Sequence, residues 1–290
     1  MPNVKDLKVR IASIKNTQKI TQAMKLVAAS KVRKVQQWVL NSRPYTEQIE
    51  TFVSRLVGSL SPSDKQEFPL FHERETKSVC LLVISSDRGL CGGYNTNIIK
   101  RTVQRIKELK EKGITTKLIL IGNKANNFFR RLKIDVLDSF CQIPAIPTVE
   151  LSNLIADSLK KAFLENKVDH VEIIGTKFIS MLRSEIYDMN YLPILPPSHF
   201  KSPTSNFVLF EPSMTDVLNY LLPLYLNNVI FHALLEAACS ELASRMNAMS
   251  NATNNAKDII NILSTIYNKA RQASITQEIM EIVGGAEALK

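Results

Sequence analysis

Residues near the start of the chain repeat at alternating steps of three and four, and most of them are apolar. The series is broken only at Gln18 and Lys25, and it consists of Val4, Leu7, Ile11, Ile14, Thr21, Ala28, Val32, Val35 and Val39. This heptad spacing is typical of the seam of a coiled coil. Because the first glycine is Gly58, we expect one helix of about 50 residues, roughly 75 Å long, which Pro44 kinks or ends.

The last third of the chain shows the same spacing. Its predicted seam consists of Ala252, Ala256, Ile259, Leu263, Ile266, Ala270 and Ala273, and an apolar face extends upstream through Val217, Leu221, Leu224, Leu234, Ala238 and Leu242. No glycine occurs between Thr176 and Val283 and no proline from Leu224 onward, which favours continuous helix. Two such helices around a central domain predict an antiparallel coiled coil. Two ordinary core helices of a bundle are the alternative.

The middle of the chain alternates between strand and helix patterns. We predict strands at Val79–Ser85, Lys117–Ile121 and Val171–Ile174, and helices at Asn95–Lys112 and Val149–Asn166, with Thr148 as the N-cap of the second helix. This order predicts a small α/β domain with a largely parallel sheet. We expect flexible connections at Ser61–Glu75 and at Leu192–Asn206, which contains four prolines.

The predicted fold class is therefore α/β with a long antiparallel coiled coil. Residues 1–60 form the N-terminal helix, 61–76 a linker, 77–207 the α/β domain and 208–290 the C-terminal helix. The longest apolar runs, such as Val79–Ile84 and Leu221–Leu226, fall short of the roughly 20 residues that cross a bilayer, and the charged start Met1–Arg10 predicts no secretory signal. Four widely spaced cysteines without a CxxC pair predict a reducing compartment, without a zinc site or disulfides.

The net charge of +10 raises the question of nucleic-acid binding. Residues 1–60 carry +8, residues 61–207 carry +5 and residues 208–290 carry −3, so the two ends are complementary. A nucleic-acid-binding coiled coil is one alternative function. However, Trp38 is the only aromatic residue in the first 44, and the basic residues are spread around the helix, so a base-stacking platform and a single continuous basic face are both missing. The sequence therefore predicts no nucleic-acid partner.

A glycine-containing segment, Ser85–Asn95, lies between a predicted strand and a predicted helix, where phosphate-binding loops occur. A nucleotide-dependent α/β enzyme is thus a second alternative. The spacing of Gly89, Gly92 and Gly93 is GxxGG, which matches neither GxxxxGK[ST] nor GxGxxG. We expect a structural tight turn that presents Asp87 and Arg88 as an exposed contact pair.

No catalytic, cofactor or metal site is predicted. Cys91 would need a histidine base to act as a nucleophile, and the histidines stand isolated at His72, His170, His199 and His232. We expect Cys91 to be a small buried or surface thiol, and we hypothesise that it lies on an exposed turn. The carboxylates form no spaced cluster typical of metal binding or of acid–base chemistry.

Four longer blocks carry a resemblance to a known family. They are IASIKNTQKITQAMKLVAASKVR from Ile11, SDRGLCGGYN from Ser86, ELASRMNAMSNA from Glu241 and YNKARQASITQEIMEIVGGAEAL from Tyr267. With these blocks the sequence resembles the gamma subunits of F-type ATP synthases, the central rotor shaft, over nearly its whole length. The resemblance implies that the N- and C-terminal helices form a shaft inside a ring of three alpha and three beta subunits. It implies that the central Rossmann-like α/β domain forms a foot beside the c-ring and the epsilon subunit.

The resemblance also implies a role and contact residues. The chain would be non-catalytic and would couple proton or sodium flow to ATP synthesis and hydrolysis on the beta subunits by rotation. Arg271 and Gln272 resemble a pair that touches a beta-subunit loop near the upper shaft. Other residues resemble positions near the lower beta-subunit lever and in the packing of the shaft. They are Met24, Arg245 and the loop with Asp87, Arg88 and Cys91.

One departure bears on the location. Plastid and cyanobacterial gamma subunits carry an insertion before the final helix, with a regulatory cysteine pair in green plastids. Here only the cysteine-free link Pro193–Pro212 occupies that region. The sequence thus predicts a peripheral protein on the cytoplasmic face of a bacterial inner membrane. An organellar location, on the thylakoid stromal or mitochondrial matrix face, is the alternative.

Overall fold

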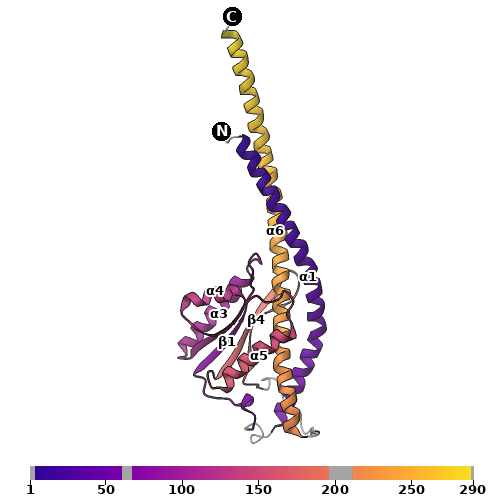
Figure 1. Cartoon of the computed structure of the whole chain (residues 1–290), viewed down its shortest axis with the longest axis vertical. Coiled ribbons are helices and arrows are strands. Elements are labelled where there is room, and N and C mark those ends of the chain that lie inside the picture. Colours follow the sequence, from indigo (N-terminus) through magenta and orange to yellow (C-terminus); the bar gives the residue numbers. More distant parts are fainter. Residues whose placement is uncertain (1–3, 61–66, 196–210, 212, 289–290) are drawn as a thin grey trace. The chain divides into compact units, whose positions relative to one another are not determined.

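The structure is a computed structural model that describes residues 4–60, 67–195, 211 and 213–288. The chain separates into two compact units, one formed by residues 1–29 and 245–290 and the other by residues 30–244. Two long helices contribute to both units. They are α1, Val4–Ser59, and α6, Met214–Ala288, which contain 56 and 75 residues (Figure 1).

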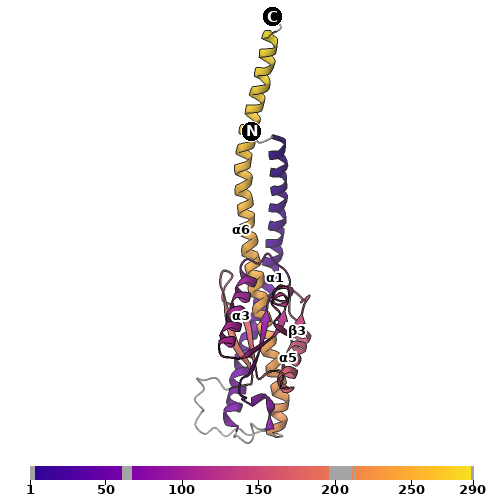
Figure 2. The same cartoon turned by 90° about the vertical axis from the view of Figure 1, so that its left-hand side faces the viewer.

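In the first unit, α1 and α6 pack side by side in opposite directions (Figure 2). The heptad seam of α1 is confirmed, because Leu7, Thr21 and Ala28 are buried at multiples of seven residues. On α6 the buried positions Met249, Ala256 and Leu263 also recur at seven. Burial at these spacings on both helices is what a coiled-coil seam requires.

The predicted seam of α6 is wrong at two positions. Ile259 and Ile266 are 44% and 39% exposed, whereas the half-buried Thr253, Ile260 and Tyr267 complete the steps of three and four. The hydroxyl of Thr253 lies against Thr21 of α1. The face that α6 turns to its partner is therefore set by how the side chains pack, and the apolar character of single residues does not decide it.

Proline does not end either long helix. α1 continues through Pro44 and α6 through Pro223. The prediction that Pro44 could end the helix is wrong because residues before and after it are buried in the protein interior, as Val39, Ile49 and Val53 show. Tertiary packing of this kind outweighs the loss of one backbone hydrogen bond.

The second unit contains a five-stranded sheet with the strand order β3-β2-β1-β4-β5. The pairs β3–β2, β2–β1 and β1–β4 are parallel and β4–β5 is antiparallel, which confirms the largely parallel sheet. The strands are β1 Ser78–Ile84, β2 Thr115–Ile121, β3 Asp135–Phe140, β4 His170–Phe178 and β5 Ser184–Leu192. The sequence did not predict β3, β5 or the short helix α4, Asn123–Phe129.

Helices cover both faces of the sheet (Figure 1). On one face, Val79, Leu81 and Val83 of β1 pack with α4 and with α3, Tyr94–Glu111. On the other face, the alternate residues of β1 pack with α5, Val149–Leu164, and with those parts of α1 and α6 that belong to this unit. The predicted N-cap is confirmed, since the Leu151 N–H donates to Thr148 Oγ1 at 3.4 Å. Both faces are buried, as expected for a parallel sheet.

The expected flexible connections are partly wrong. Phe68 and Phe71 are buried in the core around a short 3₁₀ helix, Pro69–Phe71. Beyond β5, the Ile194 N–H donates to the Leu70 carbonyl at 2.9 Å, so the two connections hold each other. Apolar side chains in these segments are the reason, because burying them favours order. The remaining parts, residues 61–66 and 196–206, lie outside the described residues.

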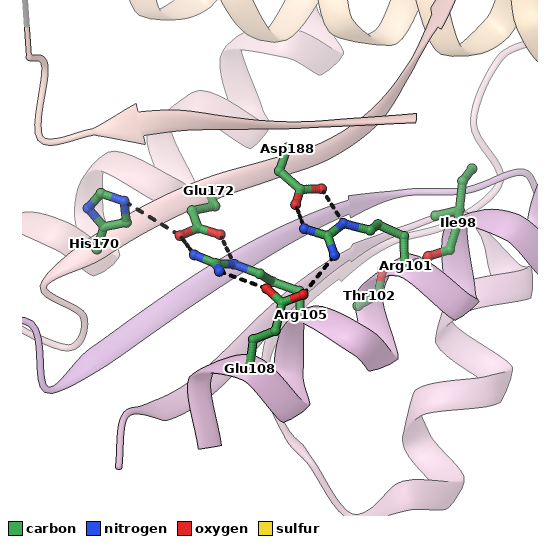
Figure 3. A network of polar contacts seen from close by, with 8 residues as sticks. All are labelled: Ile98, Arg101, Thr102, Arg105, Glu108, His170, Glu172 and Asp188. Carbon is green, nitrogen blue, oxygen red and sulfur yellow. Dashed lines mark hydrogen bonds and ion pairs between the residues drawn. The ribbon is translucent and has the colours of Figure 1, made fainter. Parts of the chain in front are cut away.

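A polar network ties α3 to the edge of the sheet (Figure 3). Arg101 pairs with Asp188 of β5, and Arg105 donates to Glu172 of β4 at 2.6 and 2.8 Å. Glu108 accepts from both arginines at 2.9 and 3.0 Å. Bidentate arginine–carboxylate pairs fix geometry as well as adding energy, so this network fixes β5 on the sheet.

One described helix, α6, is long and apolar enough to cross a membrane by length and composition, with a mean hydropathy of 1.3 over its most apolar window. The prediction that the chain spans no membrane considered only uninterrupted apolar runs, and not the mean hydropathy of a longer window. Length and composition do not separate a membrane span from a core helix. In this structure Leu218, Leu222, Leu226 and Ile230 of α6 are buried in the core beside the sheet.

Candidate partner-binding surfaces

The loop that follows β1 is shaped by Asp87. Its carboxylate accepts three backbone N–H groups, from Asn123 at 2.9 Å, Gln142 at 3.1 Å and Ile143 at 2.6 Å. The loop is thereby fastened to the start of α4 and to the segment after β3. The prediction of an exposed Asp87–Arg88 pair is wrong for Asp87, which is half-buried, whereas Arg88 is exposed. A carboxylate that accepts several backbone donors serves mainly to hold the loop in shape.

Cys91 is buried, with 2% of its surface exposed, so its predicted place on an exposed turn is wrong. Asn95 donates to its sulfur, with Nδ2 at 3.1 Å from Sγ. Cys91 packs in the same apolar cluster as Tyr94 and Ile98 of α3. The tight turn itself is confirmed, and its outward residue is Leu90, which is 63% exposed at φ 63°. The glycine spacing predicted a turn but not which side chain faces outward.

The other residues suggested by resemblance lie on the two long helices. Arg271 and Gln272 are consecutive and exposed on α6. Met24 of α1 and Arg245 of α6 are half-buried. The structure thus leaves Arg271 and Gln272 accessible to a partner, and it holds Met24 and Arg245 partly within the protein.

The C-terminal end of α6 carries an exposed apolar surface that sequence reasoning missed. Its large residues are 48–72% exposed, namely Ile275, Ile279, Met280, Ile282 and Val283. α1 exposes similar residues on its outer side, at Val9, Ile20, Leu26 and Val27. Contiguous exposed apolar residues mark interaction surfaces. A search for apolar residues outside the heptad seam would have found them.

Groups that could support catalysis do not gather among the described residues. No cluster of three or more histidines, cysteines, aspartates or glutamates that could hold a metal occurs in that part of the chain. His170 lies beside Glu172 and His232 beside Glu236, while His199 is outside the described residues. Burial raises the pKa of both Cys80 and Cys239 to about 12, which disfavours the reactive thiolate.

Comparisons with known proteins give a consistent result. A family model described as ATP synthase matches residues 3–289. The ATP synthase gamma chains of Synechocystis sp. and Trichormus variabilis are each 44% identical to this chain over 315 aligned positions, which cover all of both proteins.

Solved structures agree in fold. The central stalk and c-ring structure of Tetrahymena thermophila mitochondrial ATP synthase contains a chain of 28% identity and TM-score 0.61, with 80% of this chain and 99% of that chain covered. A chain in the Euglena gracilis mitochondrial ATP synthase structure with OSCP, F1 and c-ring has TM-score 0.72 at 18% identity, with 99% and 94% covered. The second match shows the fold alone.

Proposed function

The chain belongs to the ATP synthase gamma-chain family, and on this premise we propose how its surfaces serve the rotor of that complex. Its function is that of the central-stalk subunit of an F-type ATP synthase. It couples ion flow through the c-ring to ATP synthesis and hydrolysis at the beta subunits, by rotation inside the ring of alpha and beta subunits. The observation that carries this conclusion is the 44% identity over the full length of the relatives.

The long helices suit this role physically. At 1.5 Å per residue, a helix of 75 residues reaches about 110 Å. Pairing of α6 with α1 through the seam of the first unit stiffens both helices there. Because the pair has no rotational symmetry, each beta subunit meets a different side of it at any moment. Rotation can therefore bias each beta subunit toward a different conformation in turn.

We assign the contacts to beta subunits as follows. Arg271 and Gln272 touch a beta loop near the end of the shaft, where their exposure supports the assignment. The loop after β1 presents Arg88 and Leu90 to the lower beta lever, while Asp87 and Cys91 keep the loop in shape. Met24 and Arg245 support the shaft beside that lever.

The four regions take distinct parts in this proposal. Residues 1–60 and 208–290 form the shaft, residues 77–207 form the foot beside the c-ring and the epsilon subunit, and residues 61–76 join shaft and foot. Neither a cofactor nor a nucleic-acid partner is part of the proposal. The complex is a peripheral membrane complex, and we place it on the cytoplasmic face of a bacterial inner membrane.

The comparison with relatives also supports the alternative of an organellar location. The alignments span 315 positions against 290 residues, so at least 25 positions of the cyanobacterial chains face gaps in this chain. A chain without those positions is still 44% identical to cyanobacterial gamma chains. Location on the thylakoid stromal face is therefore the second candidate, and cell fractionation followed by immunodetection of this chain distinguishes the two.

Reconstitution tests the proposed function. Alpha and beta subunits mixed with the purified chain should give a complex with sustained ATP hydrolysis, and the chain alone should show none. Native membranes should yield alpha, beta and epsilon subunits with the tagged chain. Failure to associate with alpha and beta subunits, or hydrolysis by the chain alone, would contradict the proposal.

Paired variants test the contacts at the end of the shaft. Replacing Arg271 and Gln272 by alanine should lower ATP hydrolysis of the reconstituted complex, because both side chains face outward. Lys269→Ala, an exposed residue on the same helix, is the matched control and should retain activity. If the Arg271 and Gln272 double variant hydrolyses ATP at the same rate as Lys269→Ala, these two residues do not make the proposed contact with a beta subunit.

A further inference from the structure

A buried carboxylate joins three elements of the second unit. Glu236 of α6 is 2% exposed. Its Oε1 accepts from Arg43 Nε of α1 at 2.9 Å, and its Oε2 accepts from the backbone N–H of Phe178, the last residue of β4, at 2.7 Å. Arg43 Nη2 in turn donates to the Phe178 carbonyl at 2.6 Å. We call this closed set of contacts between Glu236, Arg43 and Phe178 the three-way clamp.

Apolar side chains surround the Glu236 end of the clamp, while Arg43 stays partly exposed. Val32, Val35 and Val39 of α1 and Leu235 and Cys239 of α6 pack around Phe178 in one apolar cluster. Interactions between charged groups are stronger where water is excluded. The carboxylate has the hydrogen-bond partners that a buried charge needs.

A histidine completes the environment of Glu236. His232 Nε2 lies 3.4 Å from Glu236 Oε1, and Ser42 Oγ lies 3.0 Å from His232 Nδ1. Burial raises the pKa of Glu236, but hydrogen bonds from His232, the Phe178 N–H and Arg43 outweigh burial and lower the pKa overall. Glu236 is therefore ionised at neutral pH and keeps its pairing with Arg43.

The clamp differs in kind from the apolar packing beside it. Hydrophobic contact is non-directional, so it does not by itself set a distance and an angle between two groups. Charge-assisted hydrogen bonds from the planar guanidinium set both distance and angle. The strand that receives them is internal, paired with β1 on one side and β5 on the other. A force on the sheet therefore reaches α1 and α6 through this point as well as through the apolar cluster between them.

We propose that Glu236 is a positioning residue that transmits torque between the α/β domain and the two long helices. The inference rests on the proposed function as a rotor. It assigns to one buried carboxylate the rigid connection that such a rotor needs between the part that receives torque and the part that delivers it.

Torsional stiffness of the assembled complex tests this role. The complex is immobilised through its beta subunits and stalled, a probe is attached to the exposed α3 position through Lys110→Cys, and the angular variance of the probe is recorded. Glu236→Gln keeps the size of the side chain but places an amide donor among the donors of Arg43 and Phe178. The variance should rise above that of the unsubstituted chain.

Val39→Ala is the matched control. Val39 is fully buried in the same cluster, so its truncation loosens packing without touching the carboxylate. Its angular variance should rise less than that of Glu236→Gln. An unchanged variance for Glu236→Gln, or an equal rise for Val39→Ala, would overturn the inference.

A second variant covers failure to assemble. Arg43→Lys retains the charge but loses the fork that reaches both Glu236 and Phe178, so it should also raise the variance. If Glu236→Gln does not assemble and Arg43→Lys has wild-type variance, the inference is overturned. A wild-type probe that fails to turn with ATP contradicts the rotor function, whereas wild-type rotation with unchanged stiffness in the variants contradicts only the clamp.

Discussion

The side-chain oxygens of Thr21 and Thr253 lie 2.8 Å apart in the seam between α1 and α6. Each hydroxyl also lies near a carbonyl of its own helix, Thr21 at 3.0 Å from Gln18 and Thr253 at 2.7 Å from Met249. On α6 the seam neighbours of Thr253 are the buried Met249 and Ala256, whereas on α1 the seam neighbours of Thr21 are the polar Gln18 and Lys25. A polar pair at such positions fixes the register of two helices, often at a cost in stability.

Valine substitutions test this pair. Thr21→Val or Thr253→Val alone should cost about 1 kcal/mol, because one hydrogen bond is lost while the remaining hydroxyl keeps its backbone partner. The double variant should be as stable as either single variant or more stable, because both partners are then apolar and of similar shape. Denaturant unfolding of the full chain measures the three free energies of unfolding. Strictly additive losses would show that the two hydroxyls are not coupled.

Gly122 should be the glycine least tolerant of alanine in the α/β domain. It lies at φ 87°, and a Cβ atom there would come within 2.5 Å of the Ser85 carbonyl oxygen. We expect Gly122→Ala to cost more than the roughly 1–3 kcal/mol of backbone strain alone and to displace the loop that Asp87 holds.

Gly113→Ala is the control for backbone strain. Gly113 lies at φ 72°, but no atom lies within 4 Å of the Cβ position. Its loss in the free energy of unfolding should therefore be smaller than that of Gly122→Ala. Equal losses in the free energy of unfolding for the two variants would show that the close approach to Ser85 does not add to the cost of Gly122→Ala.

Thiol reactivity should follow burial. Cys141 is half-buried, whereas Cys80, Cys91 and Cys239 are buried. Maleimide should therefore label Cys141 first in the folded chain, and the other three only when the protein opens. Mass spectrometry of the labelled peptides gives the order. Labelling of Cys91 as fast as Cys141 would contradict the buried placement of Cys91.

His170 should make the stability of the α/β domain sensitive to pH. Desolvation lowers the pKa of His170, Glu172 opposes this by raising it, and Arg105 lowers it again, so the pKa lies below its usual 6.5. The folded state then binds fewer protons than the unfolded state. His170 therefore leaves the free energy of unfolding unchanged above about pH 6.5. It lowers that free energy as the pH drops toward the pKa of His170 in the folded state.

Unfolding between about pH 7.5 and about pH 5.5 measures this dependence. His170→Gln should reduce the slope of the free energy of unfolding against pH. Lys107→Gln, an exposed residue of α3, should keep the wild-type slope. If His170→Gln and Lys107→Gln give the same slope, the pH dependence of the free energy of unfolding arises from other groups.

Local periodicity predicted the long elements well. The spacing of three and four residues in the first forty positions located the buried side of α1, and the apolar run around Leu81 located β1. These signals are strong because a helix or buried strand must place apolar residues at fixed intervals. The sequence also predicted the turn after β1.

Features that depend on distant partners were beyond such reasoning. β5 alternates poorly because it is an edge strand, and Arg101 of α3 pairs with its Asp188 from a position 87 residues away. Cys91 is buried because it packs in one apolar cluster with side chains from β1, β2, α4 and β4 that are distant in the sequence. The sequence does not identify Glu236 as a site, since its partner Arg43 is 193 residues distant. Only the folded chain brings such groups together.

Rotation of this chain inside the alpha–beta ring is the central claim, and single-molecule observation tests it most directly. The complex is fixed through its beta subunits and a probe is attached to the α/β domain. With ATP the probe should turn continuously in one direction, and it should stop when ATP is withdrawn. A stationary or randomly moving probe in complexes that contain the chain and hydrolyse ATP at the full rate would contradict the account.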